Sequence, residues 1–171
     1  PAPGTQVSYF VGDQLIRFSR PAVPFFTCSK ADLYTLFSCL APSAVLRAFA
    51  AVATEQKIVL VSRRWSFLAA AASALLSLLF PLRWSSLFVP VLPWSMVGVL
   101  DCPGAYLVGL HADFFAQLQL PAEVVVVDMD RSTVTGLPLA CRLPARERNT
   151  LLRRLRKCAD IHMQPASASS S

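Results

Sequence analysis

Residues 58–61 read Ile58-Val59-Leu60-Val61, an uninterrupted apolar run in which three of the four residues are β-branched. A strand of a parallel sheet has this composition when helices cover both of its faces and leave it no polar side. Residues 67–80 follow with helical capacity, rich in alanine and leucine, until Pro81 ends the helix. A buried strand followed directly by a helix is the repeating unit of an α/β fold.

Three further runs downstream have the same buried-strand pattern. They lie at 87–89, 106–108 and 124–127, and stretches with helical capacity at 95–100 and 112–118 separate them. Strands that alternate with helices in this way form parallel sheets. The sequence therefore predicts an α/β fold with a mainly parallel sheet and helices on both of its faces.

Two helices are predicted upstream of the strand at 58–61. Apolar residues recur at helical spacing over 33–40 and again over 43–55, and Pro42 interrupts the pattern between them. Ser29 is placed to cap the first of these helices. In the same way, Ser66 is placed to cap the helix that follows the first buried strand.

An antiparallel β-hairpin is predicted at the start of the chain. Apolar runs at 7–11 and 15–18 flank Gly12-Asp13, a turn pair. At the other end, the polar run that closes the chain has nothing apolar to bury, so we expect disorder there. We expect the chain to be a segment of a larger protein. It is predicted to comprise a hairpin segment, a central α/β module, a connector with a basic amphipathic helix, and a tail, at 1–28, 29–135, 136–162 and 163–171.

The charge distribution, the cysteine spacing and the N-terminal sequence indicate the class of protein and its location. The formal net charge is +6, and seven of the sixteen basic residues lie between Arg142 and Lys157, so the positive charge is local. The five cysteines are widely spaced, lack a Cys-x-x-Cys pair for zinc, and fit reduced thiols in the cytosol. No secretion signal is visible at the N-terminus. We therefore expect a cytoplasmic location.

A membrane-embedded fragment is an alternative, because 54% of the residues are hydrophobic. Between Trp65 and Leu100 the only charged residue is Arg83, and residues 65–82 have the length of a transmembrane helix. However, the stretch is rich in alanine and serine, and Pro81 interrupts it. A helix packed on a sheet is favoured, since each of its large apolar side chains would contribute about 1.5–3 kcal/mol on burial in an ordinary core.

Two carboxylates, Asp128 and Asp130, lie at the carboxyl end of the predicted strand 124–127, where α/β sheets bind ligands. They resemble the opening motif of haloacid-dehalogenase-type phosphatases, in which the first Asp is the nucleophile, the second is the acid/base and magnesium lies between them. The next residues, Arg131-Ser132, depart from that family, and only about forty residues remain to supply its downstream ligands. Asp side chains that cap a turn are favoured instead. No catalytic residue, metal site or cofactor is predicted.

Neither histidine supports a zinc site or a catalytic triad. His111 and His162 are the only two, and the chain has no Gly-x-Ser-x-Gly elbow and no phosphate loop. We expect His111 to be a polar residue at the end of a strand.

The basic stretch from Arg142 to Lys157 has leucines near helical spacing, with the arginines mostly on the other face. Such a helix can contact acidic lipid at a membrane surface. It has no interleaved aromatic residue for base stacking, so no nucleic-acid partner is expected. A solvated outer helix or a domain connector is the favoured interpretation.

Five strings resemble the central module of the DENN domain. The resemblance runs from about Ile16 to Val134, roughly two-thirds of the chain, and the second and third strings are adjacent and distinctive. The strings are Glu55-Gln56-Lys57-Ile58-Val59-Leu60-Val61-Ser62, Ala74-Leu75-Leu76-Ser77-Leu78-Leu79-Phe80-Pro81-Leu82-Arg83-Trp84, Phe88-Val89-Pro90-Val91-Leu92-Pro93, Gly109-Leu110-His111 and residues 124–130.

The chain departs from the usual DENN pattern in two predicted loops. Arg63-Arg64-Trp65 replace small polar residues after the first strand, and Cys102-Pro103-Gly104-Ala105 lacks a second proline. Both departures are expected to leave the fold intact and to bear on the choice of partner.

The resemblance implies a role in binding a Rab-type small GTPase and exchanging its guanine nucleotide during membrane trafficking. An exchange factor binds the nucleotide-free conformer better than the nucleotide-bound one, so it needs a shaped surface and no covalent chemistry. A complete DENN domain also has a longin-like module before this one and a helical module after it, which are expected as partners. Peripheral association with vesicle or endosomal membranes fits this role. A scaffold without exchange activity is the alternative.

Loops at the carboxyl ends of parallel strands carry most binding sites of α/β folds. Exposed tryptophan and arginine are the commonest anchors of protein interfaces. We therefore predict that the GTPase is contacted by six residues that follow three predicted strands, namely Arg63, Arg64, Trp65, Pro93, Trp94 and His111.

Overall fold

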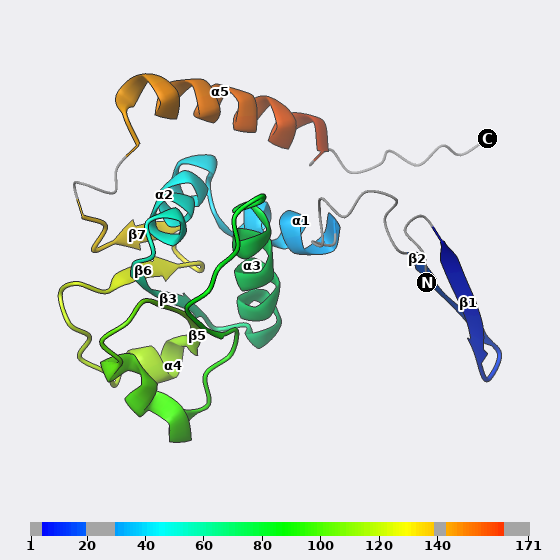
Figure 1. Cartoon of the computed structure of the whole chain (residues 1–171), viewed down its shortest axis with the longest axis horizontal. Helices are drawn as coiled ribbons and strands as arrows, with labels where there is room; N and C mark the ends of the chain where they lie inside the picture. Colours follow the sequence, from blue (N-terminus) through cyan, green and yellow to red (C-terminus); the bar gives the residue numbers. More distant parts are fainter. Residues whose placement is uncertain (1–4, 20–29, 139–142, 163–171) are drawn as a thin grey trace.

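A five-stranded sheet in the order β4-β5-β3-β6-β7 forms the centre of the chain (Figure 1). The computed structural model describes residues 5–19, 30–138 and 143–162. Strands β4, β5, β3 and β6 run parallel to one another, and the short β7 is antiparallel to β6. The strands are β3 (Lys57–Ser62), β4 (Leu87–Val89), β5 (Tyr106–His111), β6 (Val125–Asp128) and β7 (Thr133–Thr135).

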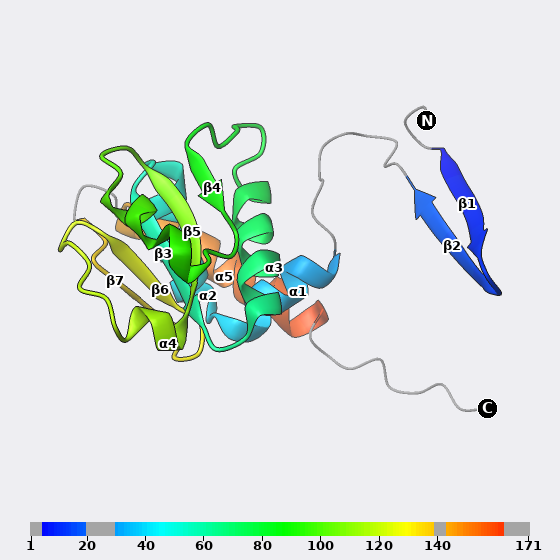
Figure 2. The same ribbon diagram turned by 90° about the horizontal axis from the view of Figure 1, so that it is seen from below.

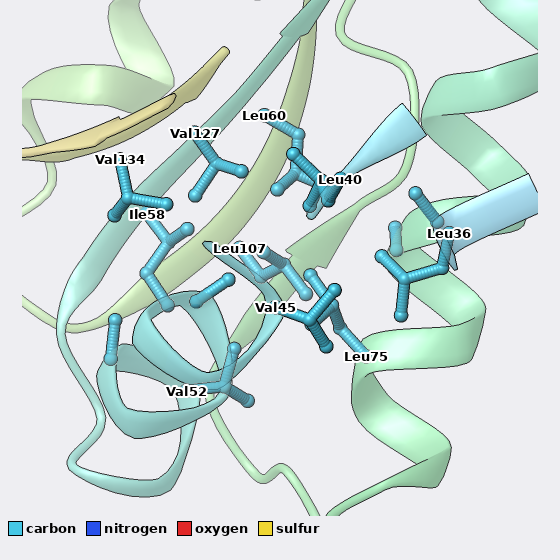
Figure 3. Packing of buried hydrophobic residues seen from close by; sticks show 14 of the residues in the cluster. Leu36, Leu40, Val45, Val52, Ile58, Leu60, Leu75, Leu107, Val127 and Val134 are labelled. Atoms are coloured by element: carbon cyan, nitrogen blue, oxygen red, sulfur yellow. The ribbon is translucent and has the colours of Figure 1, made fainter. Parts of the chain in front are cut away.

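Helices cover both faces of this sheet, as the uninterrupted apolar strands predicted. Alternate side chains of β3 point to opposite sides: Ile58 and Leu60 belong to one apolar core, and Val59 and Val61 to the other. Figure 3 shows the first core, where helix residues pack against the sheet. Its helices are α1 (Lys30–Cys39), α2 (Pro42–Ala53) and α3 (Trp65–Ser77), and the opposite face carries the 3₁₀-helix η1 (Trp94–Asp101) and the short α4 (Ala112–Phe115).

Helix α3 differs from its predicted bounds. Its N-cap residue is Arg64, which makes no capping hydrogen bond with its side chain, so the prediction that Ser66 caps this helix is wrong. Ser66 lies inside the first turn. At the other end the helix stops at Ser77, and a turn carries the chain through a cis peptide bond at Phe80-Pro81.

The small residues of α3 allow it to lie close to the sheet. Leu68 and Leu75 are fully buried, and so are three of the five alanines between them, Ala71, Ala72 and Ala74. Alanine side chains let the helix approach the strands, which explains why this stretch is both apolar and rich in small residues. Within the described residues no single helix has the length and apolar character to cross a bilayer, although α1 and α2 together pass that test as a pair bent by 112°.

The strands β1 (Gln6–Val11) and β2 (Gln14–Ser19) form the predicted antiparallel hairpin. Gly12 adopts a φ of 61° at its turn, in the region that favours glycine. Figures 1 and 2 show the hairpin standing apart from the five-stranded sheet, and every residue of β1 is exposed. Ser29, predicted as the cap of α1, lies outside the described residues.

Pro90 ends β4 at the edge of the sheet, as expected for a residue that cannot donate a ladder hydrogen bond. The chain then turns inward, and the amide of Leu92 donates to the carbonyl oxygen of Gly109 at 2.7 Å. A Cβ atom on Gly109 would lie 1.9 Å from the carbonyl oxygen of Pro90, so only glycine fits at this point of β5.

The C-terminal helix α5 (Ala145–His162) lies over α2, on the side of the sheet away from α4 (Figure 1). It contains most of the stretch predicted as a basic amphipathic helix, whereas Arg142 lies outside the described residues. Leu152 and Leu155 are half-buried, and six basic side chains are exposed: Arg146, Arg148, Arg153, Arg154, Arg156 and Lys157.

Candidate partner-binding site

The carboxylate of Asp130, in the turn between β6 and β7, fixes the loop after β3. The hydroxyl of Ser62 donates to Oδ1 of Asp130 at 3.0 Å, and the amide of Arg63 donates to Oδ2 at 2.9 Å. The amide of Arg64 in turn donates to the Ser62 hydroxyl oxygen at 3.1 Å. Asp130 therefore holds the backbone of this loop through both oxygens, while the side chains of Arg63 and Arg64 stay exposed to solvent.

Asp128 caps the turn that follows β6. Its Oδ1 accepts hydrogen bonds from the amides of Asp130 at 3.0 Å and Arg131 at 2.9 Å, which confirms the predicted turn-capping arrangement. Of the two carboxylates that resemble a phosphatase motif, one thus holds its own turn and the other holds the loop after β3. Among residues 5–19, 30–138 and 143–162, no group of three or more His, Cys, Asp or Glu side chains is placed to hold a metal ion.

Four aromatic rings meet beside this loop. Trp65 stacks on His111, with ring centroids 4.5 Å apart and planes inclined by 22°. Phe114 joins Trp65 at 5.8 Å and His111 at 6.0 Å in edge contacts, and Trp94 lies 5.3 Å from Phe114. Trp65 is 43% exposed and Trp94 is 46% exposed, so the rings support one another while presenting apolar area to solvent.

His111 ties the rings to the β3 loop. Its Nε2 lies 2.9 Å from the carbonyl oxygen of Arg63, and its Nδ1 accepts a hydrogen bond from the amide of Asp113 at 3.3 Å. A carbonyl oxygen can only accept, so the neutral ring with its proton on Nε2 satisfies both contacts. The same ring nitrogen Nδ1 lies 3.5 Å from a carboxylate oxygen of Asp113. His111 thereby joins the carboxyl ends of β3 and β5.

The two arginines of the loop have no acidic partner among the described residues. The guanidinium of Arg64 lies over the ring of Phe67, 4.9 Å from its centroid, in a cation–π contact. Both side chains are therefore available to an acidic group on another molecule. We refer to Arg63, Arg64, Trp65, Trp94, His111 and Phe114 together as the aromatic–arginine patch.

The structure brings five of the six predicted residues into this patch, and the sixth, Pro93, is the N-cap residue of η1 directly before Trp94. Sequence reasoning missed Phe114, which completes the ring contacts, and the anchoring role of Asp130. Phe114 lies three residues after His111 in a stretch with helical capacity, a spacing that could have placed it beside the histidine. Asp130 gave no such signal, because its partners are distant in sequence.

Cys39 lies near the patch and has the properties of an inert thiol. Burial raises the pKa of its thiol, the negative charge of Asp130 raises it further, and Arg64 acts in the opposite direction. A raised pKa leaves less of the nucleophilic thiolate at neutral pH. Cys39 and Cys102 are both unpaired, in agreement with the prediction of reduced thiols for these two residues.

Comparison with known proteins places this chain beside one family. A family model described as the DENN (AEX-3) domain matches residues 1–132. The Elicitor of plant defense protein 1 of Fusarium odoratissimum is 36% identical over 129 residues, which are 75% of this chain and 14% of that protein. Human DENN domain-containing protein 2B is 33% identical over 72% of this chain and 11% of its own length. DENN domain-containing protein 3 of Mus musculus is 33% identical over 69% and 9%, respectively. The chain therefore spans only a small part of each of these relatives.

Proposed function

The chain belongs to the DENN domain family, and from that premise we propose that it forms part of a surface that binds a Rab-type small GTPase and promotes exchange of its guanine nucleotide. The aromatic–arginine patch is the observation that supports this proposal. It combines exposed tryptophan with arginines that have no acidic partner in the described part of the chain, and tryptophan and arginine are the side chains that most often anchor protein interfaces. It also lies at the carboxyl ends of the parallel strands, where α/β folds bind their ligands.

Nucleotide exchange places few chemical demands on this surface. The exchange factor accelerates release because it binds the nucleotide-free GTPase more tightly than the nucleotide-bound form. Such differential binding needs a rigid surface held in one shape. Asp130 and His111 supply that rigidity, since they fix the loop after β3 from two sides.

The exposed basic face of α5 supports a second contact, with the acidic surface of a vesicle or endosomal membrane. Leu152 and Leu155 are half-buried, and the arginines and Lys157 of α5 are exposed on a helix at the periphery of the fold (Figure 1). Each basic side chain near an anionic surface contributes about 1 kcal/mol of attraction. We expect the protein to co-sediment with vesicles that contain phosphatidylserine and to remain in solution with neutral phosphatidylcholine vesicles. Equal sedimentation with both would contradict this contact.

The test of exchange is release of a fluorescent guanine nucleotide from a panel of Rab proteins. The full-length protein is expected to accelerate release from at least one Rab, and the isolated 171-residue chain is expected to have little effect. Stable interfaces bury roughly 1,200–2,000 Å² in total, and a GTPase that also contacts a flanking module loses much of that area when the module is absent.

Two outcomes would change the proposal. If the full-length protein binds a Rab but accelerates release from none, the scaffold alternative is correct. If neither binding nor release is seen with any Rab, the proposed partner itself is wrong.

A further inference from the structure

The loop after β3 contains a pattern that exchange does not explain. Ser66 follows Arg63 by three residues and Arg64 by two, in the string Arg63-Arg64-Trp65-Ser66. No other serine or threonine of the chain has arginine at both of these positions. Protein kinases select substrates through such charge patterns, and arginine at both positions is typical of substrates of basophilic serine kinases.

The hydroxyl of Ser66 is available in the folded protein. Ser66 is exposed, and among the described residues its side chain makes no hydrogen bond. The serines before the first turn of α3 and at its end differ, since the hydroxyl of Ser62 donates to Asp130 and that of Ser77 donates to the carbonyl oxygen of Ala74 at 2.6 Å. Modification of Ser66 therefore breaks no hydrogen bond of its side chain within the described part of the chain.

The first turn of α3 can open to enter a kinase active site. Its N-cap residue, Arg64, makes no capping hydrogen bond with its side chain, so the amides of this turn lack the usual side-chain acceptor. The ends of helices open more readily than their centres. Trp65 is 43% exposed, and its ring contacts with His111 and Phe114 separate when this turn opens. The hydrogen bonds of the Arg63 backbone to Asp130 and His111 must open with it.

We propose that Ser66 is the phosphorylation site of an arginine-directed serine kinase, and that its phosphate draws Arg63 and Arg64 away from the GTPase. The kinase transfers the γ-phosphoryl group of ATP. A bond forms between Oγ of Ser66 and the γ-phosphorus, the bond from that phosphorus to the bridging oxygen breaks, and ADP leaves with the electron pair. The hydroxyl proton passes to a carboxylate of the kinase.

Electrostatic attraction is expected to hold a phosphate on Ser66 close to the surface of the protein. It adds a charge of about −1.5 to −2 at neutral pH, close to Arg63 and Arg64 and inside the first turn of a helix, where negative charge is favourable. The pairing offsets the positive charge of the aromatic–arginine patch. This consequence rests on the proposed function, because it assumes that the arginines contact the GTPase.

The chain provides a matched control for the site. Arg83-Trp84-Ser85 repeats the tripeptide Arg64-Trp65-Ser66, and Ser85 is also exposed, but Leu82 stands where the second arginine would be needed. Full-length protein is treated with ATP and the catalytic subunit of cyclic-AMP-dependent protein kinase, and the modified residue is identified by mass spectrometry. We expect phosphate on Ser66 in the unsubstituted protein and in Ser85→Ala, none at that position in Ser66→Ala, and at least tenfold less after Arg63→Ala with Arg64→Ala. Labelling of heat-denatured protein without labelling of the native fold would overturn the site.

The regulatory consequence has its own readout. Phosphorylation is expected to slow Rab nucleotide release by roughly tenfold, as charge reversal of the arginines should, and kinase treatment of Ser66→Ala is expected to change nothing. Phosphate on Ser66 with an unchanged release rate would overturn the regulatory part alone. If the unmodified protein accelerates no Rab, the proposed function fails, whereas mass spectrometry still decides the modification site.

Independent of any GTPase, ³¹P NMR titration tests whether the phosphate pairs with the arginines. The second pKa of a phosphoserine is about 6, and we expect a lower value at Ser66 that returns toward 6 in Arg63→Ala with Arg64→Ala. An identical value in both proteins would show that the phosphate stays in solvent and would overturn the pairing.

Discussion

The same tripeptide, Arg-Trp-Ser, occurs at both ends of the sheet and has opposite surroundings. Arg64-Trp65-Ser66 follows β3 at the carboxyl end of the parallel strands, where Trp65 is 43% exposed and stacks on His111. Arg83-Trp84-Ser85 precedes β4 at the amino end, where Trp84 packs against the core and donates from Nε1 to the carbonyl oxygen of Leu87 at 3.2 Å. The difference teaches that position in the sheet decides whether a tryptophan stabilises the fold or presents a surface. If so, substitutions at the amino end should reduce stability, and those at the carboxyl end should reduce binding.

The largest expected effect is on stability at the amino end. Trp84→Ala removes a ring that packs against the core and leaves a cavity, so the free energy of unfolding should fall by about 2–4 kcal/mol. Trp65→Ala removes mainly an exposed stack and should lower it by about 1 kcal/mol or less. Urea denaturation of the two variants measures both values. Equal losses would break the comparison.

Alkaline pH should also lower the free energy of unfolding through a residue at the amino end of the sheet, by somewhat less than Trp84→Ala does. Tyr106, paired with Leu87 at the start of β5, is fully buried and donates its hydroxyl to the carbonyl oxygen of Leu100 at 3.2 Å. Burial raises the pKa of Tyr106 to about 12, and the negative charges of Glu123 and Asp101 contribute.

The folded protein favours the neutral phenol of Tyr106, so ionisation of this phenol at alkaline pH lowers the free energy of unfolding. The contribution is fully present below the unfolded pKa of about 10 and is lost as the pH rises toward 12, which amounts to about 2–3 kcal/mol. Unfolding measured at several alkaline pH values should show this loss, and Tyr106→Phe should remove it. A loss of the same size in Tyr106→Phe would assign it to other groups.

At the carboxyl end the expected effect is on binding. Trp65→Ala should weaken binding of the full-length protein to its Rab by about 2 kcal/mol, roughly 30-fold, because exposed tryptophans at interfaces are common hot spots. Trp84→Phe, which keeps a ring in the core, is the control and should bind as the unsubstituted protein does. Titration calorimetry measures both. Weaker binding in the control than in Trp65→Ala would reverse the roles of the two ends.

Most of the fold was predictable because the uninterrupted apolar runs indicate strands that are buried on both faces. The run Ile58-Val59-Leu60-Val61 indicates helices on both faces, and the structure confirms them. The strand β7, of three residues, was missed because so short a segment carries no period of its own. The N-cap of α3 was predicted wrongly, since Ser66 satisfies a local preference that the bonds from Ser62 and Arg63 to Asp130 override.

The candidate site was predictable only in outline. The topology of a parallel sheet gathers loops at the carboxyl ends of its strands, so Arg63, Trp94 and His111 could be placed at one edge from sequence alone. The contacts that fix the patch join residues far apart in the chain, such as His111 and the carbonyl oxygen of Arg63, 48 residues away. Sequence periodicity carries no signal for such pairs, and that is why the roles of Asp130 and Phe114 emerged only from the structure.

The most direct test of the central claim reverses one charge at each end of the sheet. Arg64→Glu and Arg83→Glu alter the same position of the repeated tripeptide, and both arginines are exposed and without an acidic partner among the described residues. Nucleotide release from the responsive Rab is measured with the full-length protein. Arg64→Glu should slow release by roughly tenfold, because a favourable ionic contact becomes repulsive, and Arg83→Glu should leave the rate unchanged. Equal rates in the two variants, or a slower rate in Arg83→Glu, would contradict the assignment of the partner surface to the carboxyl end.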